Sequence, residues 1–486
     1  MDYVLLLERY AGAEDNRGSA QKALHAALKS AIQDGALAAG TRLLSSRVLA
    51  QELGIARNTV VYAYEQLVSE GYLSTDRRGS VVNSMAVLAR QLQAIAPSAQ
   101  TNLNLARRAQ NLMSLPVAAD LTTGFAPGVP SLSDFPLALW RKYMDRTWRH
   151  LPVASLGYAD AAGEWELRTA IVDHLRASRG VNCDPEQVFI TDGTQSSLSL
   201  CAHALADVDD QIWMENPGYV GAQVAFRSAQ LTLRGIAVDQ DGIAPQASDW
   251  EQYPPRLIYV TPSHQYPTGH VLSLNRRLEL IRQAQQFGSL LIEDDYDSEF
   301  RHDGPPLPAM QGLVSDAPVV YLGTFSKTMF PALRIAYIIL PKNLVSPMRV
   351  LMGKASLRGR SAEQICLAKF IRDGHFLLHL RRMRRLYQQR RDALVQLLHR
   401  YLDDIVRIQG DSAGMHLSLT FCDANVDDVL ISQRALAMGI VVPALSVHLI
   451  GKHSQFQSGL MLGYAQVPVE AMEALVISLA QLIRSP

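Results

Sequence analysis

The chain has little of what marks several large classes of protein. It has four cysteines in 486 residues, and their spacing matches no metal-binding or redox motif. It has no run of about eighteen apolar residues that could cross a membrane, no secretory signal and no internal repeat. Its 46 basic and 46 acidic residues leave no net charge that would indicate a polyanionic partner. We therefore expect a cytoplasmic protein with reduced thiols and no membrane partner.

The composition is that of an ordinary globular protein. Hydrophobic residues make up 48% of the chain and charged residues 19%. The length of 486 residues is enough for about three domains. These figures indicate no particular function, which has to be inferred from local motifs.

One lysine stands in an unusual setting. The apolar run 318–322 predicts a buried strand, and Lys327 follows it in the stretch Gly-Thr-Phe-Ser-Lys-Thr-Met-Phe-Pro-Ala-Leu-Arg, residues 323–334. Partial burial favours the neutral amine of a lysine, which can attack an aldehyde to form a Schiff base. Nearby groups that suit a phosphate are Thr324, Ser326 and Arg334. The combination indicates a pocket for pyridoxal 5′-phosphate (PLP), although this stretch alone also fits a loop lysine in solvent beside an unrelated arginine.

A second stretch, residues 289–300, begins as an apolar strand and ends in acidic residues. A PLP enzyme needs a carboxylate against the pyridinium nitrogen of the cofactor, and Asp294 at the carboxyl end of the strand is the candidate. A solvated acidic loop and a divalent metal site are the alternatives. We expect no metal, because no histidine or further carboxylate cluster has ligand spacing nearby.

Two turns further upstream complete the expected set of cofactor contacts. Residues 188–197 predict a strand, a turn of small residues and a helix start, where free backbone N–H groups suit a phosphate. Residues 215–219, Glu-Asn-Pro-Gly-Tyr, put the ring of Tyr219 in a turn, where it can stack on a pyridine ring. Each pattern is common by itself. Their order along the chain, from phosphate turn through aromatic turn and acid to lysine and arginine, is specific.

The wording of four motifs resembles a known family. They are residues 215–219, Thr-Pro-Ser-His-Gln-Tyr-Pro-Thr-Gly at 261–269, Ile-Glu-Asp-Asp-Tyr-Asp-Ser-Glu-Phe at 292–300, and the lysine stretch 323–334. The region that carries them resembles the PLP-dependent transferases of fold type I, the aspartate aminotransferase-like α/β fold. Within that fold, the motifs are similar to those of the MocR/GabR-type regulators.

This resemblance implies a role for each residue of the pocket. Lys327 carries the imine, Asp294 faces the ring nitrogen, and Tyr296 reaches the 3-hydroxyl. Tyr219 stacks on the ring. The phosphate is surrounded by Gly193, Thr194, Gln195, Thr324 and Arg334.

Two positions depart from the aminotransferase pattern. Tyr266 stands where aminotransferases have the asparagine that binds the 3-hydroxyl, so we expect His264 or Gln265 to supply that hydrogen bond. Met461, in the segment Met-Leu-Gly-Tyr-Ala, stands where amino-acid aminotransferases have the arginine that holds the substrate carboxylate. Both departures argue against efficient transamination. Exchange of the imine with an amine needs only Lys327 and PLP.

Strands and helices alternate through the same region. The expected strands are 188–191, 211–214, 256–260, 290–293, 319–322 and 335–340. This alternation predicts a mostly parallel sheet with helices on both faces. A helical stretch at 342–400 and a small C-terminal domain at 405–486 follow. The basic run 381–385 is interpreted as a solvated or salt-bridged helix face, with contact to DNA as the alternative.

The N-terminal region carries the pattern of a winged helix-turn-helix. A short strand and a polar loop are expected in residues 1–18. Three helices follow, the first from Ala20 and the third from Arg57, and a basic hairpin is expected at 73–82. This order indicates a domain that binds double-stranded DNA, and a three-helix interaction module is the alternative.

The third helix would enter the major groove with its first residues near the base edges. These residues are Arg57, Asn58 and Thr59. Backbone contacts are expected from Arg47, which opens the preceding helix, and from Arg77 and Arg78 at the hairpin tip. Residues 20–82 resemble the GntR-type winged helix, with three departures from its usual wording: Leu44 for a proline, Ala56 for a serine N-cap, and Val81 for a glycine of the wing.

Three parts of the chain follow from these patterns. They are a GntR-type DNA-binding domain at 1–82, an interdomain linker at 83–118 and an aminotransferase-like PLP-binding effector domain at 119–486. The resemblance implies a homodimer whose winged heads are swapped over the partner's large domain.

Our hypothesis from the sequence is a PLP-dependent transcriptional regulator. An effector amine or amino acid would replace Lys327 in the imine, shift the large domain between two arrangements and so move the DNA-binding heads on the operator. PLP itself could be the signal, with no amine effector. An active aminotransferase with a fused DNA-binding module is the alternative from another class.

Overall fold

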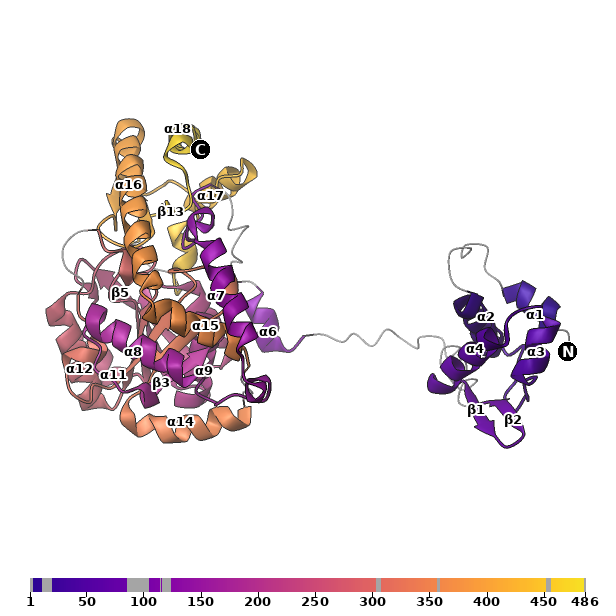
Figure 1. The fold of residues 1–486 in the computed structure, drawn as a ribbon. Helices are drawn as coiled ribbons and strands as arrows, with labels where there is room; N and C mark the ends of the chain where they lie inside the picture. Colours follow the sequence, from indigo (N-terminus) through magenta and orange to yellow (C-terminus); the bar gives the residue numbers. More distant parts are fainter. Residues whose placement is uncertain are drawn as a thin grey trace. The chain divides into compact units, whose positions relative to one another are not determined.

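The computed structural model describes residues 3–10, 20–84, 105–113, 115, 124–302, 307–355, 359–451 and 456–484. The chain divides into two compact units, Met1–Asn104 and Leu105–Pro486 (Figure 1). This boundary falls inside the expected linker 83–118, most of which lies outside the described residues. No helix in the described ranges is long and apolar enough to span a membrane.

The N-terminal unit has the helices and the hairpin of a winged helix-turn-helix. Its elements are α1 (Tyr3–Tyr10), α2 (Ala20–Gln33), α3 (Ser46–Glu52), α4 (Arg57–Ser69), β1 (Leu73–Asp76) and β2 (Gly79–Val82). Fully buried apolar side chains at helical spacing hold the three main helices together, among them Leu28, Leu49, Val60 and Leu67. The strands β1 and β2 pair antiparallel and form the wing.

The strand expected at the start of the chain is wrong. Residues 3–10 form the helix α1, which packs against α2 and α3. The reason is the spacing of Tyr3, Leu6 and Tyr10, which recur three and four residues apart and pack on the core of the unit. Such spacing places the three side chains on one face of a helix, whereas a strand would send them to both faces.

An eight-stranded sheet forms the centre of the C-terminal unit. Its strands are β3 (Val188–Thr191), β4 (Gln211–Asn216), β5 (Thr232–Asp239), β6 (Gly242–Ile243), β7 (Leu257–Val260), β8 (Leu290–Asp295), β9 (Val319–Thr324) and β10 (Ala336–Ile339). Their order is β3-β10-β9-β8-β7-β4-β5-β6, and the neighbours from β9 to β5 are parallel. β10 and β6 are antiparallel to their neighbours. The mostly parallel sheet is confirmed; β5 and β6 were not expected from the sequence.

Helices cover both faces of the sheet because successive side chains of each strand point to opposite faces. On β4, Ile212 and Met214 pack in one core with α9 (Thr194–Leu205) and α10 (Val220–Ser228). Trp213, which lies between them in the chain, packs in another core with α12 (Leu274–Phe287). The other α-helices described in this region are α6 (Arg107–Leu112), α7 (Leu137–Arg149), α8 (Trp165–Arg179), α11 (Ala247–Gln252), α13 (Met310–Leu313), α14 (Lys342–Ala355) and α15 (Ser361–Arg372).

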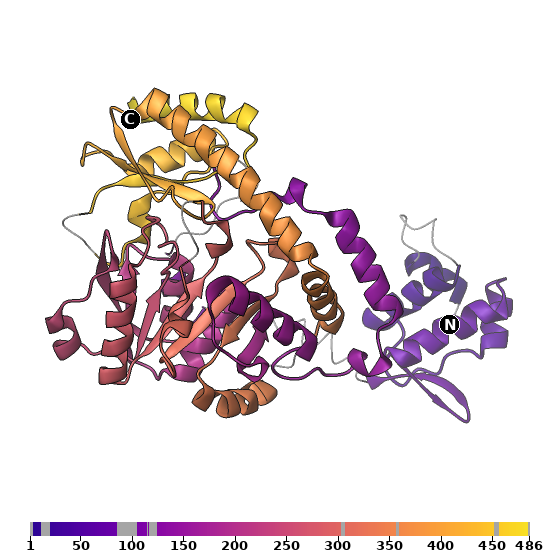
Figure 2. The ribbon, with the colours of Figure 1, turned by 60° about the vertical axis from the view of Figure 1, so that its left-hand side comes forward.

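A small C-terminal domain completes the unit. The long helix α16 (His375–Leu402) leads from the large sheet to it, as Figure 2 shows. The domain contains the antiparallel sheet β11 (Val406–Gln409), β12 (His416–Phe421) and β13 (Gly459–Gly463), with α17 (Asp428–Ala437) and α18 (Val469–Arg484). The basic run on α16 is partly engaged inside the unit. Arg382 pairs with Asp134, and Arg384 donates to the carbonyl of Glu299.

Candidate functional site

The antiparallel strand β10 gathers the expected phosphate-binding residues. Its first residue, Ala336, pairs with Thr191 at the end of β3 and with Thr324 at the end of β9. Because β10 starts where the other two strands end, the segment before it lies beside their carboxyl ends. That segment carries Arg334, and the turn after β3 carries Gly193. Residues far apart in the sequence therefore meet at the carboxyl ends of these strands, where ligands of open α/β sheets bind.

The guanidinium of Arg334 lies directly against Gly193. A side-chain Cβ at Gly193 would lie 2.8 Å from the Arg334 Cζ atom, and this glycine has a φ of 104°, so the approach requires glycine. Gly193 is the N-cap of α9, and Thr194 is the first residue of that helix. Free N–H groups and a guanidinium thus face the same point, an arrangement suited to a phosphate.

The remaining hydroxyl and amide groups on this side differ in their availability. Thr324 is buried, and its Oγ1 accepts a hydrogen bond of 3.2 Å from the backbone N–H of Ser326. Gln195 is exposed, and its side chain donates to the carbonyl of Gly221 at 3.0 Å. Thr324 and Ser326 thus lie on the same side of the site as Arg334. The amide of Gln195 is already hydrogen-bonded to the first turn of α10.

Lys327 follows β9 at the same edge. Its Nζ donates a hydrogen bond of 2.6 Å to the carbonyl of Gly128. Burial lowers the pKa of Lys327 below its usual value, and the nearby carboxylates of Asp297 and Asp294 only partly oppose this. A lowered pKa raises the fraction of neutral amine, which is the form that attacks a carbonyl.

Asp294 is the acid of the 292–300 motif that faces this site. Its Oδ2 accepts a hydrogen bond of 2.8 Å from Tyr259 on the neighbouring strand β7, and its Oδ1 has no partner among the described residues. Burial raises the pKa of Asp294 to about 7, partly opposed by the Tyr259 hydrogen bond. Asp295 points to the other face, where it pairs with Arg179 and accepts from Tyr321. The alternation of a strand thus separates the two acids.

Three aromatic rings cluster near Asp294. The centroid of the Tyr266 ring lies 5.3 Å from that of Tyr219 and 6.0 Å from that of Tyr296. The hydroxyl of Tyr296 donates to the carbonyl of His264 at 2.8 Å. These contacts bring the expected stacking ring of Tyr219 and the expected 3-hydroxyl partner Tyr296 into one cluster.

The two side chains expected to replace the missing asparagine have other partners. His264 Nδ1 lies 3.0 Å from Asp297 Oδ2, and its Nε2 lies 3.3 Å from the carbonyl of Gly410. The Gln265 amide donates to the carbonyl of Pro217 at 2.9 Å. His264 stays a predicted cofactor contact, and its Nδ1 also lies 3.3 Å from the Tyr296 hydroxyl.

Several residues of the site were missed from the sequence. They are Gly128, Tyr259, Asp297, His416 and His448. Only Asp297 lies in a motif, the stretch 292–300, so it alone could have been found. His264, Asp297 and His416 also place possible metal-ligand atoms within 4.8 Å of one another. The absence of a metal therefore stays a prediction.

The DNA-binding candidates lie at the start of α4 and on the wing. Arg57 and Asn58 are exposed, and the Arg57 Nε donates to the Ser46 hydroxyl at 3.4 Å. Arg47 on α3 is also exposed. Thr59 differs from them because only 8% of its surface is exposed, which leaves little of it for a base edge. The expected contacts to base edges therefore depend on Arg57 and Asn58.

The wing presents its two arginines in the turn between β1 and β2. Arg77 and Arg78 are both exposed there. Asp76 organises the turn, since it accepts from the backbone N–H of Arg78 at 2.6 Å and pairs with both terminal nitrogens of Arg42 at 2.9 Å. The Arg42 side chain lowers the pKa of Asp76 to about 2. Because Asp76 is held by Arg42, it does not pair with the side chains of the two arginines at the tip of the wing, which face solvent.

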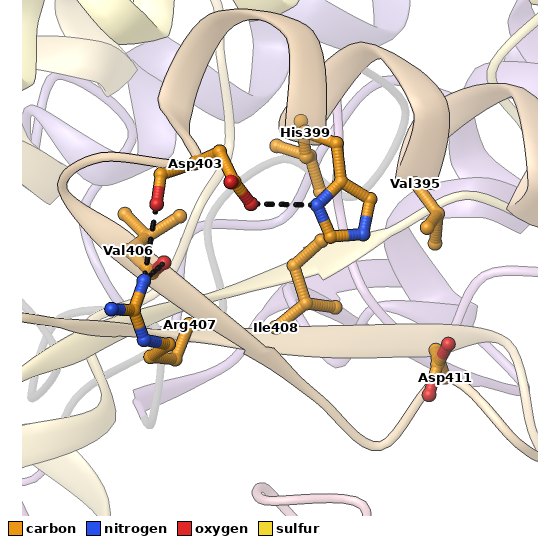
Figure 3. Close-up of a pocket in the computed structure, with 8 residues that line it drawn as sticks. Val395, His399, Asp403, Val406, Arg407, Ile408 and Asp411 are labelled. Atoms are coloured by element: carbon orange, nitrogen blue, oxygen red, sulfur yellow. Dashed lines mark hydrogen bonds and ion pairs between the residues drawn. The ribbon is translucent and has the colours of Figure 1, made fainter.

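A separate hollow of about 250 Å³ lies between α16 and β11 (Figure 3). In it, His399 contacts Asp403 at 2.8 Å, and Arg407 donates to the Asp403 carbonyl at 3.0 Å. None of its lining residues belongs to the site around Lys327, Asp294 and Arg334, which is called the Lys327 cluster below. We assign no function to this hollow.

Comparison with known proteins agrees with this arrangement. Residues 132–477 match the family model for aminotransferase class I and II, and residues 20–82 match that for bacterial regulatory proteins of the gntR family. The chain is 38% identical to the probable rhizopine catabolism regulatory protein MocR of Rhizobium meliloti, over 98% of this chain and 95% of that protein. The chain belongs to the MocR-type subfamily of GntR transcriptional regulators.

Other members and the solved structures fit the same assignment. The HTH-type pyridoxine biosynthesis transcriptional regulator PdxR of Corynebacterium glutamicum is 32% identical, with 85% of each chain covered. A multiple substrate aminotransferase from Thermococcus profundus matches with a TM-score of 0.69 and 25% identity, over 79% of this chain and 96% of that one. An archaeal alanine:glyoxylate aminotransferase matches with a TM-score of 0.72 over 78% of this chain and 98% of that one, at 23% identity, which shows the fold. The expected fold type I domain in this MocR-type chain is confirmed.

The residues at the sheet edge fit PLP. Gly193 leaves room for a guanidinium and a phosphate where a Cβ would collide with Arg334. The unpartnered Oδ1 of buried Asp294 suits a protonated ring nitrogen, which would also stabilise the ionised carboxylate. Lys327, which is half-buried and has a lowered pKa, suits the aldehyde. The donor set thus matches the three parts of the cofactor: phosphate, ring nitrogen and aldehyde.

Proposed function

We propose that this MocR-type regulator binds PLP at Lys327 and senses an amine effector by exchanging it for the lysine. The observation that carries the proposal is the pairing of a half-buried Lys327, whose pKa is lowered, with a buried Asp294 on the adjacent strand. When bound, PLP supplies an aldehyde that takes up the amine of the lysine or of the effector. The chain binds the phosphate with Gly193, Thr194 and Arg334.

The rest of the pocket orients the ring and excludes water. Tyr219 and Tyr266 cover it with aromatic surface, and Tyr296 is held by the carbonyl of His264. Asp294 holds the proton on the ring nitrogen. We propose that an effector amine changes how the large and small domains close on each other, and that this change reaches the winged heads and alters their hold on operator DNA. A domain-swapped homodimer remains part of the proposal.

An active aminotransferase is the second candidate. The match to the aminotransferase family over residues 132–477 favours it. Against it stand the DNA-binding unit and the side chain of Met461, which is fully buried where amino-acid aminotransferases have an arginine. The proposal therefore gives the weight to the regulator. PLP as the sole signal uses the same residues and is separated from it by the experiment below.

Absorbance spectroscopy of the purified full-length protein tests the proposal. We expect a visible imine band that borohydride bleaches, and a shift of that band on titration with a primary amine, without steady release of a keto acid. Lys327→Ala should lose the band, while Lys354→Ala on the surface of α14 should keep it.

Each other outcome has a distinct meaning. Loss of all colour in the parent protein even after addition of PLP would reject the cofactor assignment. Continuous keto-acid release would transfer the weight to the aminotransferase. A PLP band that changes operator binding, but that no amine shifts, would support PLP as the signal.

A further inference from the structure

Two arginines beside the phosphate-binding turn have a left-handed backbone conformation. Arg334 has a φ of 50°, and Arg360, the N-cap of α15, has a φ of 66°. Residues other than glycine rarely adopt this conformation, because it is strained and the surrounding structure has to hold it in place. Arg334 is the residue expected to bind the phosphate. Arg360 lies outside every motif that indicated PLP.

The side chain of Arg360 holds the backbone of Arg334. Its Nη1 donates to the carbonyl of Arg334 at 2.9 Å, and its Nη2 donates to the carbonyl of Leu333. The first carbonyl belongs to the peptide unit after Arg334 and the second to the unit before it. These two units define φ and ψ of Arg334. A planar guanidinium bonded to both therefore fixes the strained conformation, and with it the direction in which the Arg334 side chain leaves the backbone.

The start of α15, which carries Arg360, has its own support in the large domain. The Ser361 hydroxyl donates to Glu164 Oε1 at 2.5 Å, and Gln364 Oε1 accepts from the backbone N–H of Glu164 at 2.9 Å. Both Ser361 and Gln364 are buried. Since Glu164 is the N-cap of α8, these bonds tie the first turn of α15 to another helix. Arg360 thus reaches the Arg334 segment from a fixed position.

The same guanidinium also lies near the turn between β3 and α9. Arg360 Nη1 is 3.9 Å from Oδ1 of Asp192, the residue before Gly193. Arg360 is therefore close to both parts of the phosphate site, the segment that carries Arg334 and the turn that leads into α9. The Asp192 side chain is 60% exposed, so this ion pair is weak. The hydrogen bonds to the backbone around Arg334 are the stronger connection.

We propose that Arg360 is a positioning residue for the phosphate of PLP. It holds Arg334 in the conformation that directs the Arg334 guanidinium to Gly193 and the first N–H groups of α9. Its own terminal nitrogens are engaged by the two carbonyls, so it acts through Arg334. The inference rests on the proposed function, because it concerns the phosphate site of the proposed cofactor. It goes further by giving a role to a residue outside the motifs.

A comparison of PLP with pyridoxal tests this role, because the two compounds differ only in the phosphate. Full-length protein is titrated with each, and the absorbance of the imine gives an apparent Kd. We expect Arg360→Gln to weaken PLP at least tenfold and pyridoxal less than twofold. A general structural defect would weaken both compounds to the same extent. Equal weakening of the two, or unchanged binding of both, would overturn the inference.

Two further variants separate geometry from charge. Arg372→Gln removes an exposed arginine at the other end of α15 and should change neither Kd. Arg360→Lys keeps the charge, but a single ammonium cannot reproduce the fork that spans both carbonyls. Its Kd for PLP should therefore stay closer to that of Arg360→Gln than to that of the parent. Full recovery of PLP binding by the lysine would show that charge alone matters, which would contradict the positioning role.

A double substitution tests whether Arg360 acts through Arg334, and it needs PLP alone. In a protein that already carries Arg334→Gln, the change Arg360→Gln should weaken PLP less than twofold. A tenfold loss in both backgrounds would show that the two arginines act independently and would overturn the inference. The pyridoxal band shows that a variant has kept its fold. If Arg360→Gln loses that band, the comparison of PLP with pyridoxal is made on Arg360→Lys, with a loss confined to PLP expected.

The outcomes distinguish this inference from the proposed function. If the parent protein forms no imine band with PLP or with pyridoxal, the proposed function fails and the role of Arg360 fails with it. If the parent forms the band and Arg360→Gln leaves the ratio of the two Kd values unchanged, the role assigned to Arg360 is wrong while the proposed function stands.

Discussion

Neighbouring acids at the end of β8 have opposite roles because a strand sends successive side chains to opposite faces. The charge of Asp295 is paired with that of Arg179. Asp294 has only a hydrogen bond from the Tyr259 hydroxyl, and its raised pKa favours the neutral form. The sequence allowed the choice of Asp294 from the motif. It could not show Tyr259 or Arg179 as the partners, because they come from other elements.

The raised pKa of Asp294 predicts a pH effect on the cofactor-free protein. The folded pKa, about 7, lies above that of an unfolded aspartate, so the folded state binds more protons and loses stability as the pH rises between about 4 and 7. Asp294→Asn removes this loss. Relative to the parent, its stability should rise by about 3 kcal/mol between pH 5 and pH 8. Urea unfolding followed by tryptophan fluorescence reports on this unit, since all five tryptophans lie within it.

Asp295→Asn is the matched control for that prediction. It should lower the stability at both pH values, because it leaves the buried Arg179 without its partner. A parent protein with equal stability at pH 5 and pH 8, together with no gain for Asp294→Asn, would show that Asp294 is not held in its neutral form.

Arg57 should contribute directly to operator binding. Its side chain is exposed at the first position of α4, where a helix-turn-helix protein meets base edges. Arg57→Ala should weaken specific binding by about 1–3 kcal/mol in moderate salt. The control is Arg381→Ala on α16, which should change nothing if the basic run lies away from DNA. Fluorescence anisotropy with labelled operator measures the binding of both variants. Unchanged binding for Arg57→Ala would show that the start of α4 does not contact the operator.

At the scale of elements, the caps of α3 and α4 differ. Ser45 caps α3 by accepting from the N–H of Val48 at 3.3 Å, whereas Ala56 at the N-cap of α4 offers no side-chain acceptor. Ala56→Ser should stabilise the start of α4 by about 1 kcal/mol, which slows hydrogen exchange in its first turn about fivefold. Ser45→Ala should have the opposite effect on α3. Unchanged exchange in both variants would mean that these helix ends are fixed by packing alone.

The elements that the sequence predicted are those with strong apolar patterns. All six expected strands are present, because each is a mostly buried apolar run. β5 was missed because its residues are mostly half-buried or exposed, and β6 because it has only two residues. α1 was misjudged because its apolar run of four residues, 4–7, also fits a short strand, and its packing on α2 and α3 is a tertiary effect.

At the scale of the molecule, the two units have separate cores and should work separately in part. A chain of residues 105–486 should keep the imine band and its response to amines, because every residue of the Lys327 cluster lies in that unit. It should lose all binding to operator DNA. Absorbance titration and anisotropy measure the two properties. Loss of the PLP band on removal of residues 1–104 would show that the N-terminal unit supports the cofactor site.

His416 and His448 show where sequence reasoning ends. His416 and His448 lie outside the motifs that indicated PLP, and they meet Tyr266 only because the small domain folds back onto the large sheet. Pairings across some 150 residues of sequence, as between His264 and His416, depend on the whole topology. The departure at Met461 was visible in the sequence, but its neighbours were not.

The residues proposed to hold PLP, and the side chains of His416, His448 and Met461, stand on different pieces of the chain. The former lie at one edge of the large sheet, and the latter on β12, on β13 and at the end of the segment Leu445–His448. Duplicated copies of such a gene could therefore acquire new signals by changing a few side chains of the small domain, while the PLP machinery stays as it is. Paralogues that answer different metabolites are expected to differ first in the side chains of the small domain that face Tyr266.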